Sequence, residues 1–161
     1  MRILVAVDES ENSLRAVRYV GSLLGRTPDV TLTLFHVLKP MPRELLEHGG
    51  AENPSVEARL GAQLRDDQRD WIRKECEAEC QVLQRAFEAL AESGFDTRQV
   101  ALKFGHEDDI AANILEAARE GHHETIVMGR SGASRITRIF GGGVTDQLLR
   151  AAKGFAIWIV E

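Results

Sequence analysis

The chain has 161 residues and a formal net charge of -5 at pH 7. This length predicts a single domain over residues 1–161 with one hydrophobic core. The excess of acids argues against a nucleic-acid-binding protein, and no apolar run approaches the roughly 18–20 residues that span a bilayer. The first apolar run ends at Asp8 and is too short for a secretory signal, so we expect a cytoplasmic protein with no membrane contact.

The first third of the chain predicts a strand, a helix and a second strand. The aliphatic run from Arg2 to Val7 is typical of a central parallel strand that is buried on both faces. Ser10 is a suitable helix N-cap, and Gly25 is a suitable stop. Between them, apolar residues recur at three- and four-residue spacing, at Leu14, Val17, Val20 and Leu24. Residues 30–38 alternate and then become apolar, which predicts the second strand.

The middle of the chain predicts a long connection followed by a long helix. Residues 39–61 contain several prolines and glycines, and we interpret them as a loop, either a lid or an ordinary variable connection. The helix is predicted to begin at Ala62 or Asp66 and to end at Ser93, before Gly94.

Two cysteines fall on the apolar stripe of this long helix. The stripe consists of Ile72, Cys76, Cys80, Leu83, Phe87 and Leu90. Two thiols four residues apart could share a metal ion, but the sequence offers no matching second pair of ligands. We therefore predict that both cysteines are buried in the core, and we predict no metal site.

The last third repeats the alternation of strand and helix. The predicted elements are a strand from Thr97 to Phe104, a helix opened by His106 and the acids of residues 107–109, a strand from Glu124 to Met128, a helix from Val144 to Ala152 and a strand from Phe155 to Val160. Strands that alternate with helices indicate an α/β fold, a doubly wound parallel sheet with helices on both faces.

A glycine-rich, basic loop joins the fourth strand to the last helix. From Gly129 to Gly143 the loop carries three arginines, Arg130, Arg135 and Arg138, and no acid. A strand, a glycine loop and a helix start form an arrangement that binds phosphate, because the backbone can approach the anion and the first helical N–H groups point at it. The alternative is a surface loop whose glycines only make turns. The local charge favours an anionic small ligand.

Two strand ends predict a nucleotide pocket. The first strand ends at Asp8 and the fourth at Gly129, and ligands of open parallel sheets bind at such carboxyl ends. If the two strands are neighbours, the Asp8 carboxylate can accept hydrogen bonds from ribose hydroxyls while the loop holds phosphates. Asp8 could instead only cap the first helix. His36, at the end of the second strand, either contacts a ligand or is a hydrogen-bonded strand-end histidine.

These residues resemble the universal stress protein family over essentially the whole chain. Ile3 to Ser10 is similar to the family's first strand and acid, and Phe35 to Val37 is similar to the end of its second strand. The loop matches the family's nucleotide motif, G-x2-G-x9-G-[S/T], at Gly129, Gly132 and Gly142. The next position is Gly143, where the motif has Ser or Thr.

The resemblance implies a five-stranded sheet in the order 3-2-1-4-5 and a crevice that binds ATP, with or without Mg²⁺, or another adenine nucleotide. Asp8 would contact the ribose, the main chain near Val37 would contact adenine, and the N–H groups after Gly142 would contact phosphates. The complete implied set is Val7, Asp8, Val37, Met128, Gly129, Arg130, Gly132, Gly142, Gly143 and Val144.

Gly143 departs from the motif in a way that bears on affinity. A hydrogen bond to a charged group is worth roughly 1.5–3 kcal/mol, so the missing hydroxyl could weaken binding about ten- to a hundredfold. Thr145 lies two residues later, and Arg130, Arg135 and Arg138 could compensate by charge.

The resemblance also implies a homodimer. In the order 3-2-1-4-5 the fifth strand is an edge, and the apolar run from Phe155 to Val160 invites pairing with a second copy. We expect a dimeric stress-response module that binds an adenine nucleotide, and we predict no catalytic residue. The alternatives are an interaction-only protein that binds no nucleotide and a slow ATP-hydrolysing or adenylyl-transferring enzyme.

Overall fold

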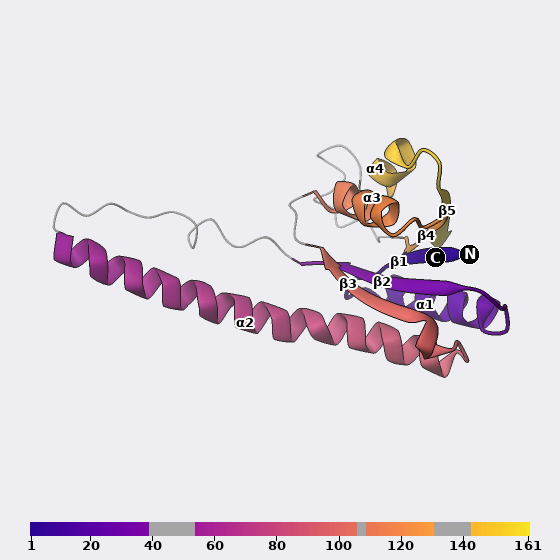
Figure 1. The fold of residues 1–161 in the computed structure, drawn as a ribbon, viewed down its shortest axis with the longest axis horizontal. Coiled ribbons are helices and arrows are strands. Elements are labelled where there is room, and N and C mark those ends of the chain that lie inside the picture. The colour runs from indigo at the N-terminus through magenta and orange to yellow at the C-terminus, as the bar shows by residue number, and fades with distance from the viewer. Residues whose placement is uncertain (39–53, 106–108, 131–142) are drawn as a thin grey trace.

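The computed structural model describes residues 1–38, 54–105, 109–130 and 143–161. Helices and strands alternate as the sequence predicts (Figure 1). In chain order they are β1 (Arg2–Ala6), α1 (Glu11–Leu24), β2 (Thr31–Val37), α2 (Pro54–Glu92), the 3-10 helix η2 (Thr97–Gln99), β3 (Val100–Gly105), α3 (Ile110–Glu120), β4 (Thr125–Gly129), α4 (Val144–Ala151) and β5 (Ala156–Val160).

The five strands form one parallel sheet in the order β3-β2-β1-β4-β5, which confirms the expected doubly wound topology. The central strand is β1, where Ile3 is in register with Leu32 of β2 and with Thr125 of β4. The side chains of Ile3 to Val5 are 0% exposed. Their continuous apolar run is explained by burial on both faces of the sheet.

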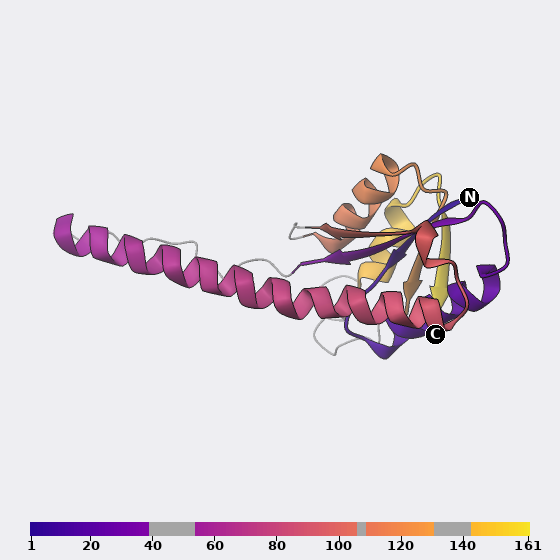
Figure 2. The same ribbon diagram turned by 60° about the horizontal axis from the view of Figure 1, so that its bottom comes forward.

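The core consists of two layers, one on each face of the sheet (Figure 2). Ile3 and Val5 of β1 point to the face covered by α1 and α2. Leu4, between them, points to the face covered by α3 and α4. This alternation follows from the two-residue period of a strand.

The helix α2 is longer than the sequence analysis predicted. It spans 39 residues from Pro54 and so includes residues 54–61, which were interpreted as part of a loop. That boundary was wrong because a proline disrupts the interior of a helix but is favoured at its first position, where Pro54 lies. Residues 39–53 lie outside the described residues.

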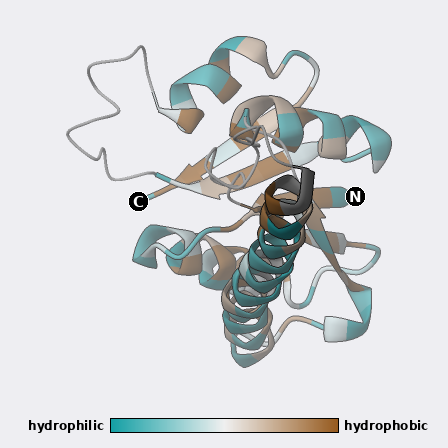
Figure 3. Cartoon of the chain, turned by 90° about the vertical axis from the view of Figure 1, so that its left-hand side faces the viewer, coloured by the Kyte–Doolittle hydropathy of each residue, from teal (hydrophilic) through white to brown (hydrophobic). Residues whose placement is uncertain are grey.

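The described side chains of α2 that are buried against the core lie in its C-terminal half. Leu83, Ala86 and Leu90 are buried there, while the N-terminal half extends past the ends of the strands (Figure 1). Seen along its axis, α2 presents a largely hydrophilic surface (Figure 3). Within the described residues, no helix has the length and apolar character needed to cross a membrane.

Cys80 is exposed, so its predicted burial was wrong. The buried face of α2 passes through Glu79 and Leu83, and Cys80 lies one residue off that line. A spacing of three or four residues defines a face only within about one residue, which explains the error. The side chain of Cys76 is outside what the structure describes.

Polar side chains fix the beginnings of three elements. Ser10 is the N-cap of α1, as predicted, and its Oγ accepts a hydrogen bond from the N–H of Ser13. Asp109 caps α3 by accepting from the N–H of Ala112 at 3.0 Å. Asp96 caps η2, so β3 begins at Val100 rather than at Thr97. Residues 106–108, predicted to open α3, are not among the described residues.

His123 connects the turn before β4 to the rest of the fold. His122 is exposed, whereas the ring of His123 is partly buried. Its Nε2 lies 2.9 Å from Oγ1 of Thr33 on β2, and its Nδ1 lies 3.3 Å from the carbonyl of Ala118. Burial is the main cause that lowers the pKa of His123 below its ordinary value, with the nearby Arg2 and Lys103 charges adding to it.

We predict that His123 makes the fold less stable in mild acid. Because its pKa is lower in the native state, the unfolded chain takes up a proton first as the pH falls below about 6.5. The unfolding free energy should therefore fall through that range and stay constant, for this group, above it.

The measurement is urea denaturation from pH 8 to pH 5. His123→Gln should show a shallower loss of stability in acid than the unmodified protein, while His122→Gln, at the exposed neighbouring position, should follow the unmodified curve. Equal slopes for all three proteins would contradict the assignment.

Candidate functional site

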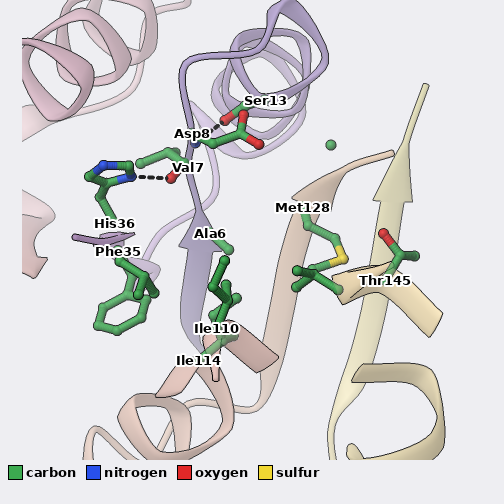
Figure 4. Close-up of a pocket in the computed structure, with 13 residues that line it drawn as sticks. Ala6, Val7, Asp8, Ser13, Phe35, His36, Ile110, Ile114, Met128 and Thr145 are labelled. Atoms are coloured by element: carbon green, nitrogen blue, oxygen red, sulfur yellow. Dashed lines mark hydrogen bonds between the residues drawn. The ribbon is translucent and has the colours of Figure 1, made fainter. Parts of the chain in front are cut away.

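A pocket of about 120 Å³ opens at the carboxyl ends of β1 and β4 (Figure 4). It lies where the chain leaves β1 toward α1 on one face and leaves β4 toward α4 on the other, which is the topological switch point of the sheet. The lining residues are Ala6, Val7, Asp8, Ser13, Phe35, His36, Val37, Ile110, Ile114, Met128, Gly129, Val144 and Thr145.

The polar wall of the pocket is built around Asp8, at the turn from β1 into α1. The N–H of Asp8 donates to Oγ of Ser13 at 3.0 Å, and Oδ1 accepts from the N–H and the hydroxyl of Ser10 at 2.9 and 2.5 Å. Ser10, not Asp8, therefore caps α1. In the described part of the chain, both hydrogen bonds to this exposed carboxylate reach Oδ1.

The opposite wall is apolar. Phe35 of β2, Met128 of β4 and the isoleucines of α3, Ile110 and Ile114, form it (Figure 4). Ile110 is 44% exposed although it faces the pocket, which indicates that the wall is open to a ligand. Neither Ile110 nor Ile114 was among the predicted site residues.

The backbone of Val37 lies at the rim. The sheet register between β1 and β2 ends at Ala6 and Phe35, and the last bond across is from the N–H of Val7 to the carbonyl of Phe35 at 2.8 Å. Backbone groups two residues apart on a strand point to the same side. The N–H and carbonyl of Val37 therefore point to the β1 side of β2, at a position beyond the end of β1.

Gly129 allows β4 to approach α1 closely. A Cβ at Gly129 would lie 2.4 Å from the carbonyl carbon of Asn12 and 2.5 Å from the nitrogen of Ser13. The backbone of the next residue, Arg130, is hydrogen-bonded to both α1 and β5. Its carbonyl accepts from Nδ2 of Asn12, and its N–H donates to the carbonyl of Val160 at 2.7 Å. These bonds hold the end of β4 against α1 and β5.

The structure brings most of the predicted site residues together. Val7, Asp8, Val37, Met128, Gly129 and Val144 line the pocket, and Gly143 caps the helix beside it. The side chain of Arg130 does not line the pocket, and its guanidinium pairs with Glu161 at the end of β5. Gly132 and Gly142 lie outside the described residues, as do Arg135 and Arg138.

The N-terminus of α4 closes the pocket. Gly143 is the N-cap, and it contributes no side-chain hydrogen bond. The N–H groups of Val144 and Thr145 belong to the first turn, where a helix supplies no backbone acceptors. Within the described chain, the Thr145 hydroxyl makes no hydrogen bond. These groups form a set of donors suited to an anion.

His36 is a hydrogen-bonded strand-end histidine, one of the two possibilities left open by the sequence. Its ring is buried, Nδ1 lies 2.7 Å from the carbonyl of Val7, and Nε2 contacts Oε2 of Glu79 on α2. Glu79 is 3% exposed, and it was not among the predicted site residues. The signal that could have found it is an acid four residues before Leu83, in line with the buried face of α2.

The described residues contain no group of three or more His, Cys, Asp or Glu side chains that could hold a metal ion. The pocket combines the carboxylate of Asp8, an apolar wall, the backbone at the end of β2 and the N-terminus of α4.

Comparisons with known proteins agree on the fold. A model of the universal stress protein family matches residues 1–154. None of the curated proteins matches the chain. A solved protein of this family from Burkholderia pseudomallei is 21% identical with a TM-score of 0.62, over 99% of this chain and 94% of that one.

Two further solved structures contain nucleotides. A universal stress protein in complex with cAMP is 18% identical with a TM-score of 0.65, over 100% of this chain and 96% of that one. A universal stress protein from Archaeoglobus fulgidus in complex with dAMP is 18% identical with a TM-score of 0.60, over 100% of this chain and 98% of that one. At these identities the likeness shows the shared fold.

The two glycines at the pocket provide a matched test of the geometry. Gly129→Ala should lower the unfolding free energy by about 1–3 kcal/mol, because the new methyl group would overlap the backbone of α1. Gly143→Ala should stay within about 1 kcal/mol of the unmodified protein, because nothing lies within 4 Å of an added Cβ and its φ of -68° suits any residue. Urea denaturation measures both, and equal midpoints for the two variants would refute the close approach.

Proposed function

The chain belongs to the universal stress protein family, and from this premise we propose that it binds an adenine nucleotide in the pocket between β1 and β4 and acts as a dimeric regulatory module of the stress response. The observation that carries the proposal is the meeting of Asp8, an apolar wall and the first turn of α4 in one pocket. The cAMP and dAMP held by the two related proteins share an adenine and a phosphate, so they support this class of ligand.

The apolar wall suits a base that lies flat against Phe35, Ile114 and Met128. The Val37 peptide at the rim offers one donor and one acceptor. Adenine matches this pair with its N1 acceptor and its exocyclic amine, whereas guanine presents a donor and an acceptor in the reverse order. A preference for adenine therefore follows from the backbone.

The sugar and phosphate would follow from the base toward α4. Asp8 uses Oδ1 for Ser10, so Oδ2 is the oxygen that we assign to a ribose hydroxyl. The N–H groups of Val144 and Thr145 would receive a phosphate. The hydroxyl of Thr145 would supply the contact that Gly143 lacks, because both belong to the same first turn of α4 and Thr145 already lines the pocket.

The function is tested by calorimetric titration with ATP, AMP, adenosine and GMP, with and without Mg²⁺. We expect micromolar binding of an adenine nucleotide, weaker binding of adenosine and little binding of GMP. If none of the adenine compounds binds, the proposal fails, and the interaction-only alternative, which the missing hydroxyl at Gly143 favours, takes its place.

Two variants test the phosphate end separately. Thr145→Val should weaken ATP binding about ten- to a hundredfold, the worth of one hydrogen bond to a charged group, and leave adenosine binding unchanged. Adding Gly143→Ser to Thr145→Val should restore most of the loss, because the extended backbone and open space at Gly143 accept a side chain. An unchanged ATP affinity in Thr145→Val would remove this residue from the site.

We also propose a homodimer in which the β5 edges of two copies pair antiparallel. β5 is an edge strand of the sheet, and Ile159 on it is 38% exposed. An uncovered apolar edge offers a row of unpaired backbone groups to a second chain.

We expect a dimer at micromolar concentration by light scattering, and Ile159→Lys should convert it to a monomer. Leu102→Lys is the control, because Leu102 is 51% exposed on β3, the opposite edge of the sheet. A monomeric unmodified protein, or dissociation by both variants alike, would argue against pairing through β5.

A further inference from the structure

A buried acid on α2 contacts the histidine beside the pocket, although none of the described side chains of α2 lines the pocket. The side chains of His36 and Glu79 are only 8% and 4% exposed. The ring of His36 also meets Phe104 of β3 edge-on, with centroids 6.4 Å apart and planes at 73°. The ring is therefore fixed between β1, α2 and β3.

The hydrogen-bond partners of His36 determine where the protons of the His36–Glu79 pair lie. A carbonyl oxygen can only accept, so Nδ1 of His36 must carry the hydrogen that it donates to Val7. Nε2 then faces Glu79 in one of two ways: Nε2–H donates to an ionised carboxylate, or a carboxylic O–H donates to a bare Nε2. Either way, one proton lies between the two side chains and the pair is neutral as a whole, which avoids an uncompensated buried charge.

The pair acts on the site through the backbone of Val7. The N–H of Val7 donates to the carbonyl of Phe35, and its own carbonyl accepts from His36. Both peptide groups around Val7 are thus bound to β2 just beyond the last residue of β1 in register, Ala6. Asp8 is the next residue, so the place where its carboxylate enters the pocket depends on the ring of His36.

We propose that Glu79 is a positioning residue of the nucleotide site: it shares one proton with His36, and this pair holds Val7, and with it Asp8, against the end of β2. The ligand class is the adenosine part of a nucleotide, whose base and ribose would span the distance from Val37 to Asp8. The effect on affinity rests on the nucleotide-binding function proposed above, whereas the proton arrangement and the effect on Asp8 do not.

The first experiment is NMR on the ligand-free protein with a ¹⁵N-labelled backbone and labelled histidine rings. We expect a hydrogen on Nδ1 of His36 and a strongly deshielded proton between Nε2 and Glu79, which Glu79→Gln should abolish while Nδ1 keeps its hydrogen. Glu79→Ala should shift the amide resonances of Val7 and Asp8, while Glu77→Ala, on the exposed side of the same helix, should not. The proposal would be overturned if Nδ1 carried no hydrogen, or if the amide resonances of Val7 and Asp8 did not shift in Glu79→Ala.

The second experiment is titration of the same variants with AMP at a temperature where circular dichroism shows each one folded. Glu79→Ala should weaken AMP binding about tenfold. Removing the hydrogen-bond partner of a ligating histidine in a metal site has an effect of this size on metal affinity. Glu79→Gln should recover most of the affinity, because its amide N–H can donate to a bare Nε2. A purely structural role predicts a loss of thermal stability in both variants without this rescue of affinity.

The two experiments separate the two ideas. If the unmodified protein binds none of ATP, AMP and adenosine, the proposed function fails, and the NMR result alone decides whether Glu79 positions Asp8. If the unmodified protein binds AMP and folded Glu79→Ala binds it equally well, the positioning role fails and the proposed function stands.

Discussion

The parallel pairing of β1 on both of its edges is the constraint on which the rest of the structure depends. A strand paired with β2 and β4 and buried on both faces must be followed by a helix that returns to the other end of the sheet. Because α1 covers one face of the sheet and α4 covers the other, the chain leaves the carboxyl ends of β1 and β4 in opposite directions. The pocket lies between these two strand ends.

The walls of the pocket are held by contacts that belong to the fold itself. Gly129 lets β4 touch α1, and the hydrogen bond from Asn12 to Arg130 joins the two elements. On the other side, His36 binds the carbonyl of Val7 and reaches Glu79 on α2. Because these bonds join elements of the fold to one another, they would preorganise the base and ribose ends of the proposed site and so lower the entropy lost on binding.

The phosphate end differs in character from the base end. It depends on the first turn of α4, where Gly143 provides the cap without a side chain and Thr145 provides a hydroxyl. The positive end of a helix dipole favours an anion there even without a dedicated side chain. Arg130, which the sequence predicted to be part of the site, is paired with Glu161 instead. Within the described residues, the backbone donors of α4 and the Thr145 hydroxyl therefore form this end of the proposed site.

The sequence by itself determined the order of elements, the parallel sheet and the two strand ends that meet at Asp8 and Gly129, because these follow from local periodicity and from glycine spacing. Family resemblance added the strand order. Only the tertiary structure decided that Cys80 is exposed, that Glu79 is buried against His36, and that Arg130 turns away from the pocket. A helical period locates a face only to within one residue, and the partner of a polar side chain is set by elements far apart in the sequence.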